Sequence, residues 1–199
     1  MPREPGRDRP GIFHGPPISP ATALASAAQR LCPPFAVASS TKHNAVRLEA
    51  TQEWLPDAEL SLRREPRLFS RTLALVVASE VSGEGPATEG VVELRKGRWG
   101  RGSSLRWRPA AGSRSGDASG EDWARRFTRE GVLTGADLMT SVQSLTLRWA
   151  AGPSVWRLEL VTLAGALIGT SPSTQVAVPM EAEDVDGLLA ILRALAAVG

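Results

Sequence analysis

The chain lacks the residues on which most familiar enzyme and metal sites depend. Its single cysteine, Cys32, leaves no partner for an internal disulfide and, beside Pro33 and Pro34, shows none of the ligand spacing of a zinc site. The two histidines, His14 and His43, fall in a predicted tail and a predicted loop, so neither is placed for acid–base chemistry. We therefore expect no bound metal and no catalytic histidine.

Cofactor and nucleophile motifs are missing as well. The glycine-rich segment 97–104, GRWGRGSS, lacks the spacing and the lysine of a phosphate-binding loop and lies between two predicted strands. In the segment 112–116, GSRSG, Arg114 stands where a nucleophile elbow needs serine. Acidic residues are numerous, but nothing in their spacing marks two of them as a facing pair. We expect no cofactor, and an enzyme that uses carboxylates or a serine is a less favoured alternative.

Long apolar runs are also absent. No stretch reaches the roughly 18–20 apolar residues that span a bilayer, and the Ala-rich segment 21–31 is too short and too polar for a signal peptide. Together with the single cysteine, this favours a cytoplasmic protein. Lysine is nearly absent, since almost all of the 23 basic side chains are arginine. We interpret this bias, with the abundance of Ala, Gly and Pro, as typical of a bacterial protein.

Length and composition predict one domain with a tail. The 199 residues are 42% hydrophobic, which is sufficient for a substantial core. Residues 1–20 are rich in Pro, Gly and Arg and are predicted to be disordered. Residues 21–199 are predicted to form a single α+β domain with a flexible Gly/Ser linker near residues 109–120.

Two predicted hairpins that carry Trp and Arg dominate the pattern. They span residues 91–109 and 145–163, and both alternate between apolar and polar side chains. If residues 151–154 form the second loop, Trp149 faces Trp156 on the buried side. Arg148 then faces Arg157 on the other side, where like charges repel unless water or an anion lies between them.

The remaining pattern predicts short strands and helices. Residues 71–81 are β-branched and largely apolar, which indicates a central strand. Further strands are predicted at residues 35–38, 45–50, 58–62, 166–170 and 174–179. Helices are predicted at residues 21–31 and 121–130, in a short segment from Thr134 with Leu138 facing inward, and at residues 182–198, where an apolar stripe is clear. We expect an antiparallel sheet of about six to eight hairpin-connected strands, packed against this C-terminal amphipathic helix and one or two short helices.

The cluster that suggests a function is basic. No acidic residue occurs between Glu93 and Asp117, and a basic hairpin with an aromatic tip can follow a phosphate backbone and stack on an unpaired base. The candidate binding residues are Arg95, Lys96, Arg98, Trp99, Arg101, Arg106 and Arg108. The near-neutral net charge of +2 is not typical of a dedicated nucleic-acid binder, so an ordinary solvated hairpin is the simpler interpretation.

The tryptophans divide into two groups. Four fit inward positions, whereas Trp54 and Trp99 are expected to be exposed, where a tryptophan is the better indicator of a binding surface. The sequence thus favours a non-catalytic protein that binds an unidentified protein partner or small ligand. Binding of nucleic acid, or of another polyanion, through the hairpin 91–109 is the alternative. The pattern leaves the oligomeric state open.

Overall fold

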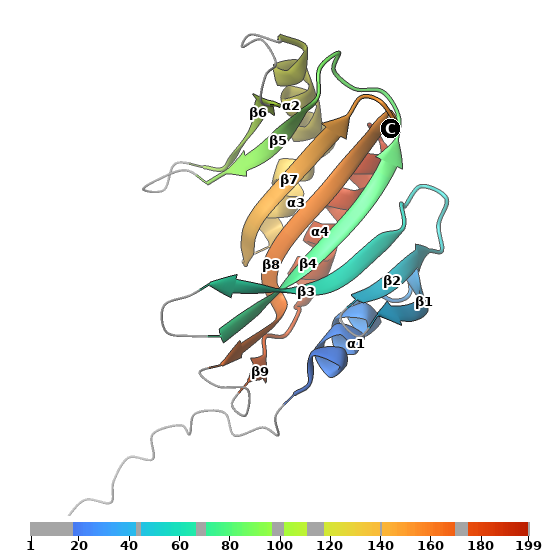
Figure 1. Cartoon of the computed structure of the whole chain (residues 1–199), viewed down its shortest axis with the longest axis vertical. Helices are drawn as coiled ribbons and strands as arrows, with labels where there is room; N and C mark the ends of the chain where they lie inside the picture. The colour runs from blue at the N-terminus through green and yellow to red at the C-terminus, as the bar shows by residue number, and fades with distance from the viewer. Residues whose placement is uncertain are drawn as a thin grey trace, which may run out of the picture.

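The computed structural model describes residues 18–42, 45–66, 71–96, 102–110, 118–139, 141–169 and 175–198. These residues form an α+β fold with an antiparallel sheet (Figure 1). The fold class is as predicted, and the sheet has nine strands instead of the six to eight that the sequence indicated. The strands are β1 (Phe35–Lys42), β2 (Ala45–Ala50), β3 (Ala58–Pro66), β4 (Arg71–Ser82), β5 (Gly90–Arg95), β6 (Ser104–Pro109), β7 (Val142–Ala150), β8 (Val155–Gly169) and β9 (Val176–Ala177). Their order is β1-β2-β3-β4-β8-β7-β5-β6, and β9 pairs with β8.

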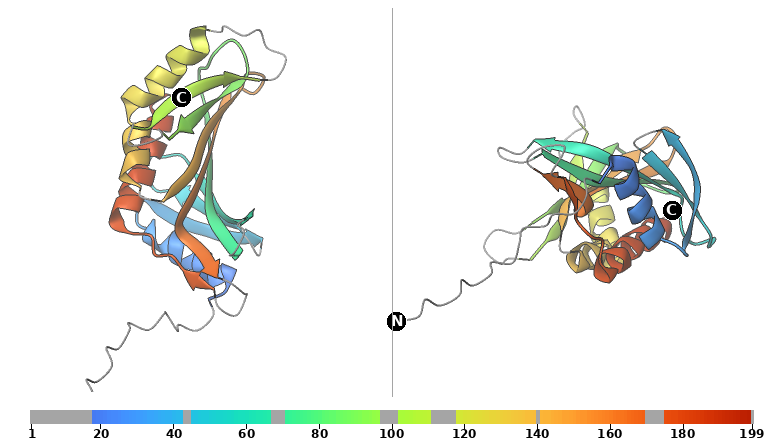
Figure 2. Two further views of the ribbon diagram at one scale, coloured as in Figure 1. Left: turned by 90° about the vertical axis from the view of Figure 1, so that its left-hand side faces the viewer. Right: turned by 90° about the horizontal axis from the view of Figure 1, so that it is seen from below.

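Four helices complete the described chain. They are α1 (Pro20–Arg30), α2 (Ala118–Glu130), α3 (Val132–Leu138) and α4 (Ala182–Ala196). Figure 2 shows α2, α3 and α4 against one face of the curved sheet, while its opposite face carries no helix of the described chain. We call this second surface the open face. Most of the predicted tail (residues 1–17) and of the predicted linker (residues 111–117) lies outside the described residues.

The second predicted hairpin has the register that alternation indicates. Across β7 and β8, Arg148 lies opposite Arg157, and Trp149 lies opposite Trp156, as predicted. The first hairpin is also confirmed, with β5 and β6 paired along their whole length. In addition β5 pairs with β7, so the two hairpins join into one half of the sheet.

One long strand replaces two predicted pieces near the C-terminus. The sequence predicts a separate strand at 166–170, whereas β8 continues from Val155 to Gly169. Gly165 has a φ of 77° and lies beside a register shift between Leu73 and Leu75 of β4. Glycine adopts this φ without steric cost, so the strand bends there instead of ending.

The helix α3 differs from its prediction. It begins at Val132, directly after Gly131, and Leu138 is 44% exposed rather than inward. Gly135 instead faces α4, where an added Cβ would lie 2.6 Å from the carbonyl oxygen of Gly187. A glycine on each helix therefore allows α3 and α4 to approach more closely than larger side chains permit.

The core is built around an aromatic cluster. The Trp156 side chain is fully buried, and its ring centroid lies 4.9 Å from Phe127, 5.2 Å from Trp149 and 5.6 Å from Trp123. The Trp156 Nε1–H donates to the carbonyl oxygen of Glu84 at 2.9 Å. Aromatic contacts thus join the sheet to α2, and the Trp156 N–H at their centre has a hydrogen-bond acceptor.

The first turn of α4 provides a test of local stability. The buried Asp184 carboxylate accepts a hydrogen bond from the Glu181 backbone N–H at 3.1 Å, which satisfies a donor at the helix start. We expect Asp184→Ala to lower the free energy of unfolding by about 1 kcal/mol, measured by urea denaturation. Asp186→Ala, an exposed neighbour on the same helix, is the control and should change it by less than half as much. Equal effects of the two substitutions would contradict a capping role.

Candidate functional site

The open face carries the polar residues of the alternating strands. One row crosses five neighbouring strands through register partners, from β6 to β4: Arg108, Val91, Arg148, Arg157 and Glu80. Neighbouring strands lie about 4.8 Å apart, so the guanidinium groups of β7 and β8 start from adjacent positions. The row therefore concentrates three arginines at one end of the open face.

Two carboxylates that border the row, Glu80 and Glu93, are paired with arginines. The Arg157 Nε lies 2.8 Å from Glu80, and the two carboxylate oxygens of Glu93 lie 2.6 Å from Arg108 and 3.2 Å from Arg95. These groups are partly exposed, so each ion pair stabilises the fold by at most about 1 kcal/mol. Their effect is to neutralise the acidic groups that border the row.

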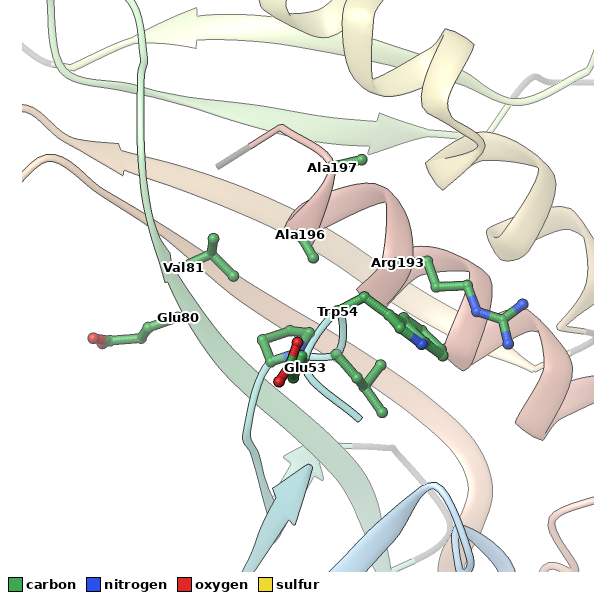
Figure 3. Close-up of a pocket in the computed structure, with 9 residues that line it drawn as sticks. Glu53, Trp54, Glu80, Val81, Arg193, Ala196 and Ala197 are labelled. Carbon is green, nitrogen blue, oxygen red and sulfur yellow. The ribbon is translucent and has the colours of Figure 1, made fainter. Parts of the chain in front are cut away.

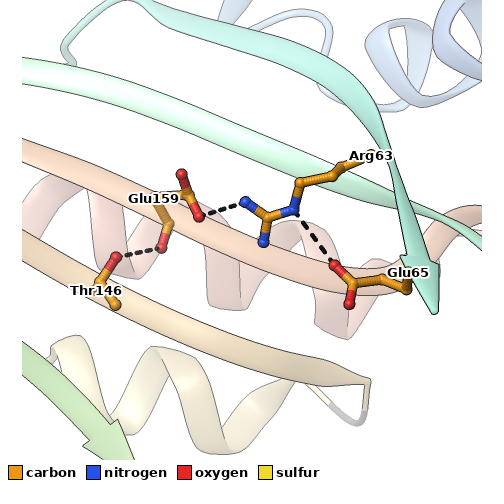
Figure 4. A network of polar contacts seen from close by, with 4 residues as sticks. All are labelled: Arg63, Glu65, Thr146 and Glu159. Atoms are coloured by element: carbon orange, nitrogen blue, oxygen red, sulfur yellow. Dashed lines mark hydrogen bonds and ion pairs between the residues drawn. The ribbon is translucent and has the colours of Figure 1, made fainter.

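A second network lies further along the strands (Figure 4). The Arg63 guanidinium bridges Glu159, at 2.7 Å, and Glu65, at 3.3 Å, and the backbone oxygen of Glu159 accepts from the Thr146 hydroxyl. The hydrogen bond with Glu159 is the main reason that the pKa of Arg63 is raised further above its already high ordinary value. Arg63 therefore remains charged at any physiological pH, and the Glu159 carboxylate is occupied by it.

Arg148 is the arginine of the row that remains without such a partner. Within the described chain, no carboxylate lies at ion-pair distance from its guanidinium, although Arg157 is its direct cross-strand neighbour. Two like charges in this position repel each other in water and favour a bound anion between them. The structure thus places the arginine pair that the alternation predicted, Arg148 and Arg157, at one position on the open face.

A pocket of about 600 Å³ opens at this location. We call it the arginine pocket, and its charged lining residues are Arg108, Arg148, Arg157 and Glu89. Trp149 also belongs to the lining, although its side chain lies on the buried face of the sheet beside Trp156. The charged lining therefore consists of three arginines and one carboxylate.

The predicted hairpin site is only partly within the described chain. Arg95 and Arg108 bind Glu93, the Lys96 ammonium donates to the carbonyl oxygen of Val142, and Arg106 is exposed on β6. Arg98, Trp99 and Arg101 lie outside the described residues, so their assignment to a binding site stays a prediction. The structure brings Arg108 together with Arg148 and Arg157, which sequence reasoning paired with each other but did not place beside the first hairpin.

The described residues contain neither a metal-binding cluster nor a helix that could span a membrane. No group of His, Cys, Asp or Glu in that part of the chain is arranged to hold a metal ion. No helix there is sufficiently long and apolar to cross a membrane. Comparisons of the chain with protein-family models, with curated proteins and with solved structures return no match. The function is therefore inferred from the geometry of the chain itself.

Proposed function

We propose that the chain is a non-catalytic binding protein whose ligand carries an oxyanion, such as a phosphate group, held in the arginine pocket. The observation that carries the proposal is the direct pairing of Arg148 with Arg157 at a pocket of about 600 Å³. A pocket of this volume suits a small ligand. The cytoplasmic location favoured by the sequence belongs to the same proposal.

Guanidinium chemistry supports an oxyanion in particular. The planar fork of arginine matches two oxygens of a phosphate or carboxylate and remains charged at every physiological pH. Arg148 and Arg157 lie on adjacent strands, so one oxyanion placed between them would remove their mutual repulsion. Arg108, two strands from Arg148, would supply a second contact if it released Glu93.

The arrangement favours binding over catalysis. Glu80 and Glu93, the carboxylates that border the row, are both held by arginines. Both carboxylates already have guanidinium partners, so their contacts do not set either apart as a general base. The arginines of the pocket can thus hold an anion, and the ion pairs of the neighbouring carboxylates do not favour proton transfer.

Nucleic acid remains the second candidate, because its backbone presents the same phosphate chemistry. Arg106 is a further exposed arginine on β6, and the sequence carries more arginines at residues 97–101, which lie outside the described residues. Against this candidate, the near-neutral net charge of +2 is not typical of a dedicated nucleic-acid binder. A small phosphorylated ligand is therefore the preferred source of the oxyanion.

Calorimetric titration with pyrophosphate tests the proposal. We expect the wild-type protein to bind pyrophosphate at low ionic strength and Arg148→Gln to weaken the affinity at least about tenfold, because a charge-assisted hydrogen bond contributes roughly 1.5–3 kcal/mol. Arg129→Gln, which removes an equal charge from an exposed site on α2, should change the affinity less than twofold. Equal affinity of Arg148→Gln and wild type, or no binding at low salt, would contradict the proposal.

The same titration with oligonucleotides distinguishes the two sources of phosphate. Single-stranded and duplex DNA of random sequence are added to wild type and Arg148→Gln at several salt concentrations. A small-ligand site predicts that both bind no more tightly than pyrophosphate. Tighter binding that weakens steeply with salt, and that falls in Arg148→Gln, would identify nucleic acid as the source.

A further inference from the structure

A second hollow lies away from the arginine pocket, where the turn between β2 and β3 meets the end of α4 (Figure 3). We call it the Trp54 groove. Its volume is about 550 Å³, within the range of small-molecule sites. Its lining includes Glu53, Trp54, Leu55, Glu80, Val81 and Arg193.

Trp54 is the aromatic surface of this groove. Its side chain is 42% exposed, the largest exposure among the tryptophans that the structure describes, and it follows the sequence-based expectation. The neighbouring Leu55 is buried and anchors the turn, while the guanidinium carbon of Arg193 lies 4.5 Å from the Trp54 ring centroid. One side of the indole is thus supported by α4, so an incoming ring would meet a surface that is already ordered.

The charges around the groove favour a cation. Glu53 is exposed at the rim, and no basic side chain of the described chain lies at ion-pair distance from it. Ala196 is the last residue of α4 and Ala197 is its C-cap, and backbone carbonyls give this end of a helix its negative character.

The other two charged residues of the groove are already engaged. Figure 3 shows the Glu80 carboxylate pointing away from Trp54, and it is held by Arg157 on the open face. The positive charge of Arg193 is positioned over the indole of Trp54. This contact leaves the charge of Arg193 in place, so an incoming ammonium group has to lie on the Glu53 side of the groove, away from the guanidinium.

From this geometry we propose that the Trp54 groove binds an aromatic ligand that carries a positively charged amine. The aromatic ring stacks on the exposed part of the Trp54 indole, and the ammonium group lies near Glu53 and the end of α4. This inference does not depend on the oxyanion site, because it involves other residues and the opposite charge.

The test uses three probes that share a phenyl ring and differ in charge: benzylammonium, benzyl alcohol and benzoate. Each is titrated into ¹⁵N-labelled protein, and the indole N–H signal of Trp54, assigned from Trp54→Phe, is followed by NMR. We expect the shift of this signal to saturate at the lowest concentration with benzylammonium and at the highest with benzoate. Equal affinities for the three probes, no shift at Trp54, or tightest binding of benzoate would overturn the proposal.

A charge substitution makes the assignment specific to Glu53. We expect Glu53→Gln to weaken benzylammonium binding roughly three- to fivefold, as the loss of one nearby charge at the surface predicts, and to leave benzyl alcohol unchanged. Glu130→Gln, an exposed carboxylate at the end of α2, is the matched control and should affect neither probe. A fall in affinity for both probes would show that Glu53 acts through the fold of the turn and would contradict its role in recognising the amine.

Retention of pyrophosphate binding in Glu53→Gln separates this test from that of the arginine pocket. If the amine probes fail while pyrophosphate still binds at Arg148, the Trp54 groove alone is ruled out. If Trp54 has only a structural role, Trp54→Phe lowers the free energy of unfolding and none of the three probes binds the wild-type protein. That combination also overturns the inference.

Discussion

Replacement of Trp156 by alanine is expected to lower the free energy of unfolding by about 4 kcal/mol. Truncation of a fully buried tryptophan removes its contacts and leaves a cavity, which costs roughly 3–5 kcal/mol. In this protein the cavity would open among Phe127, Trp149 and Trp123, and the Glu84 carbonyl would lose its donor. The midpoint of thermal unfolding should fall by about 10 °C, since 1 kcal/mol corresponds to about 2–4 °C at this chain length.

Trp54→Ala is the matched control for this prediction. It removes the same side chain from an exposed position whose principal described contact is the Arg193 guanidinium. The expected loss is about 1 kcal/mol or less, because a surface cation–π contact contributes roughly 0.5–1 kcal/mol. Similar losses in the two variants, measured by urea denaturation, would show that Trp156 is not at the centre of the core.

Gly187→Ala is expected to destabilise the protein by about 2 kcal/mol, although alanine is normally the better helix former. The added Cβ would lie 2.6 Å from the carbonyl oxygen of Gly135 and 2.5 Å from the Met139 side chain. Methionine can move, but the α3 backbone can yield only if the two helices separate. Overpacking of this kind costs about 1–3 kcal/mol and exceeds the roughly 0.5–1 kcal/mol gained from helix propensity.

The control for this substitution is Gly152→Ala in the turn between β7 and β8. A Cβ at that position would meet no atom within 4 Å, so the free energy of unfolding should change by less than about 0.5 kcal/mol. Stabilisation by Gly187→Ala would mean that α3 and α4 do not approach each other through the two glycines. Circular dichroism during chemical unfolding provides the measurement for both variants.

Local patterns were sufficient for the parts of the fold that depend on neighbouring residues. Strict alternation around residues 151–154 fixed the register of Trp149 with Trp156, because a shift by one residue would expose both rings. The apolar stripe of α4 likewise predicted which residues face the sheet, as the burial of Leu188 and Leu192 confirms. In both cases, the need to bury one face of the element determines which side chains point inward.

Features that depend on distant segments could not be predicted in this way. The pairing of β5 with β7 joins segments separated by α2 and α3, and no pattern within either strand specifies its neighbour. The continuation of β8 past Gly165 depends on hydrogen bonds between Gly165 and Val178 and between Val178 and Ala166. The close approach of Gly135 on α3 to Gly187 on α4 likewise joins segments that are distant in the sequence.

In the candidate site, too, local contacts were predicted from the sequence, whereas contacts between distant segments were not. The repulsion between Arg148 and Arg157 was predicted from the hairpin alone, whereas their proximity to Arg108 required the order of strands in the sheet. The pairing of Glu93 with both Arg95 and Arg108 was not anticipated, although alternation places all three on one side of the hairpin. This pairing shifts the positive charge available for a ligand from the first hairpin towards Arg148.

The measurement that tests the central claim most directly is a pyrophosphate titration followed at the arginine side chains by NMR. The Nε–H signals of Arg108, Arg148 and Arg157 are assigned by substituting each in turn with glutamine, and that of Arg129 serves as an internal reference. Binding in the arginine pocket predicts saturable shifts of the Arg148 and Arg157 signals with one common affinity, while the Arg129 signal does not move. Shifts of similar size at all four arginines, or none at Arg148, would contradict an oxyanion site on the open face.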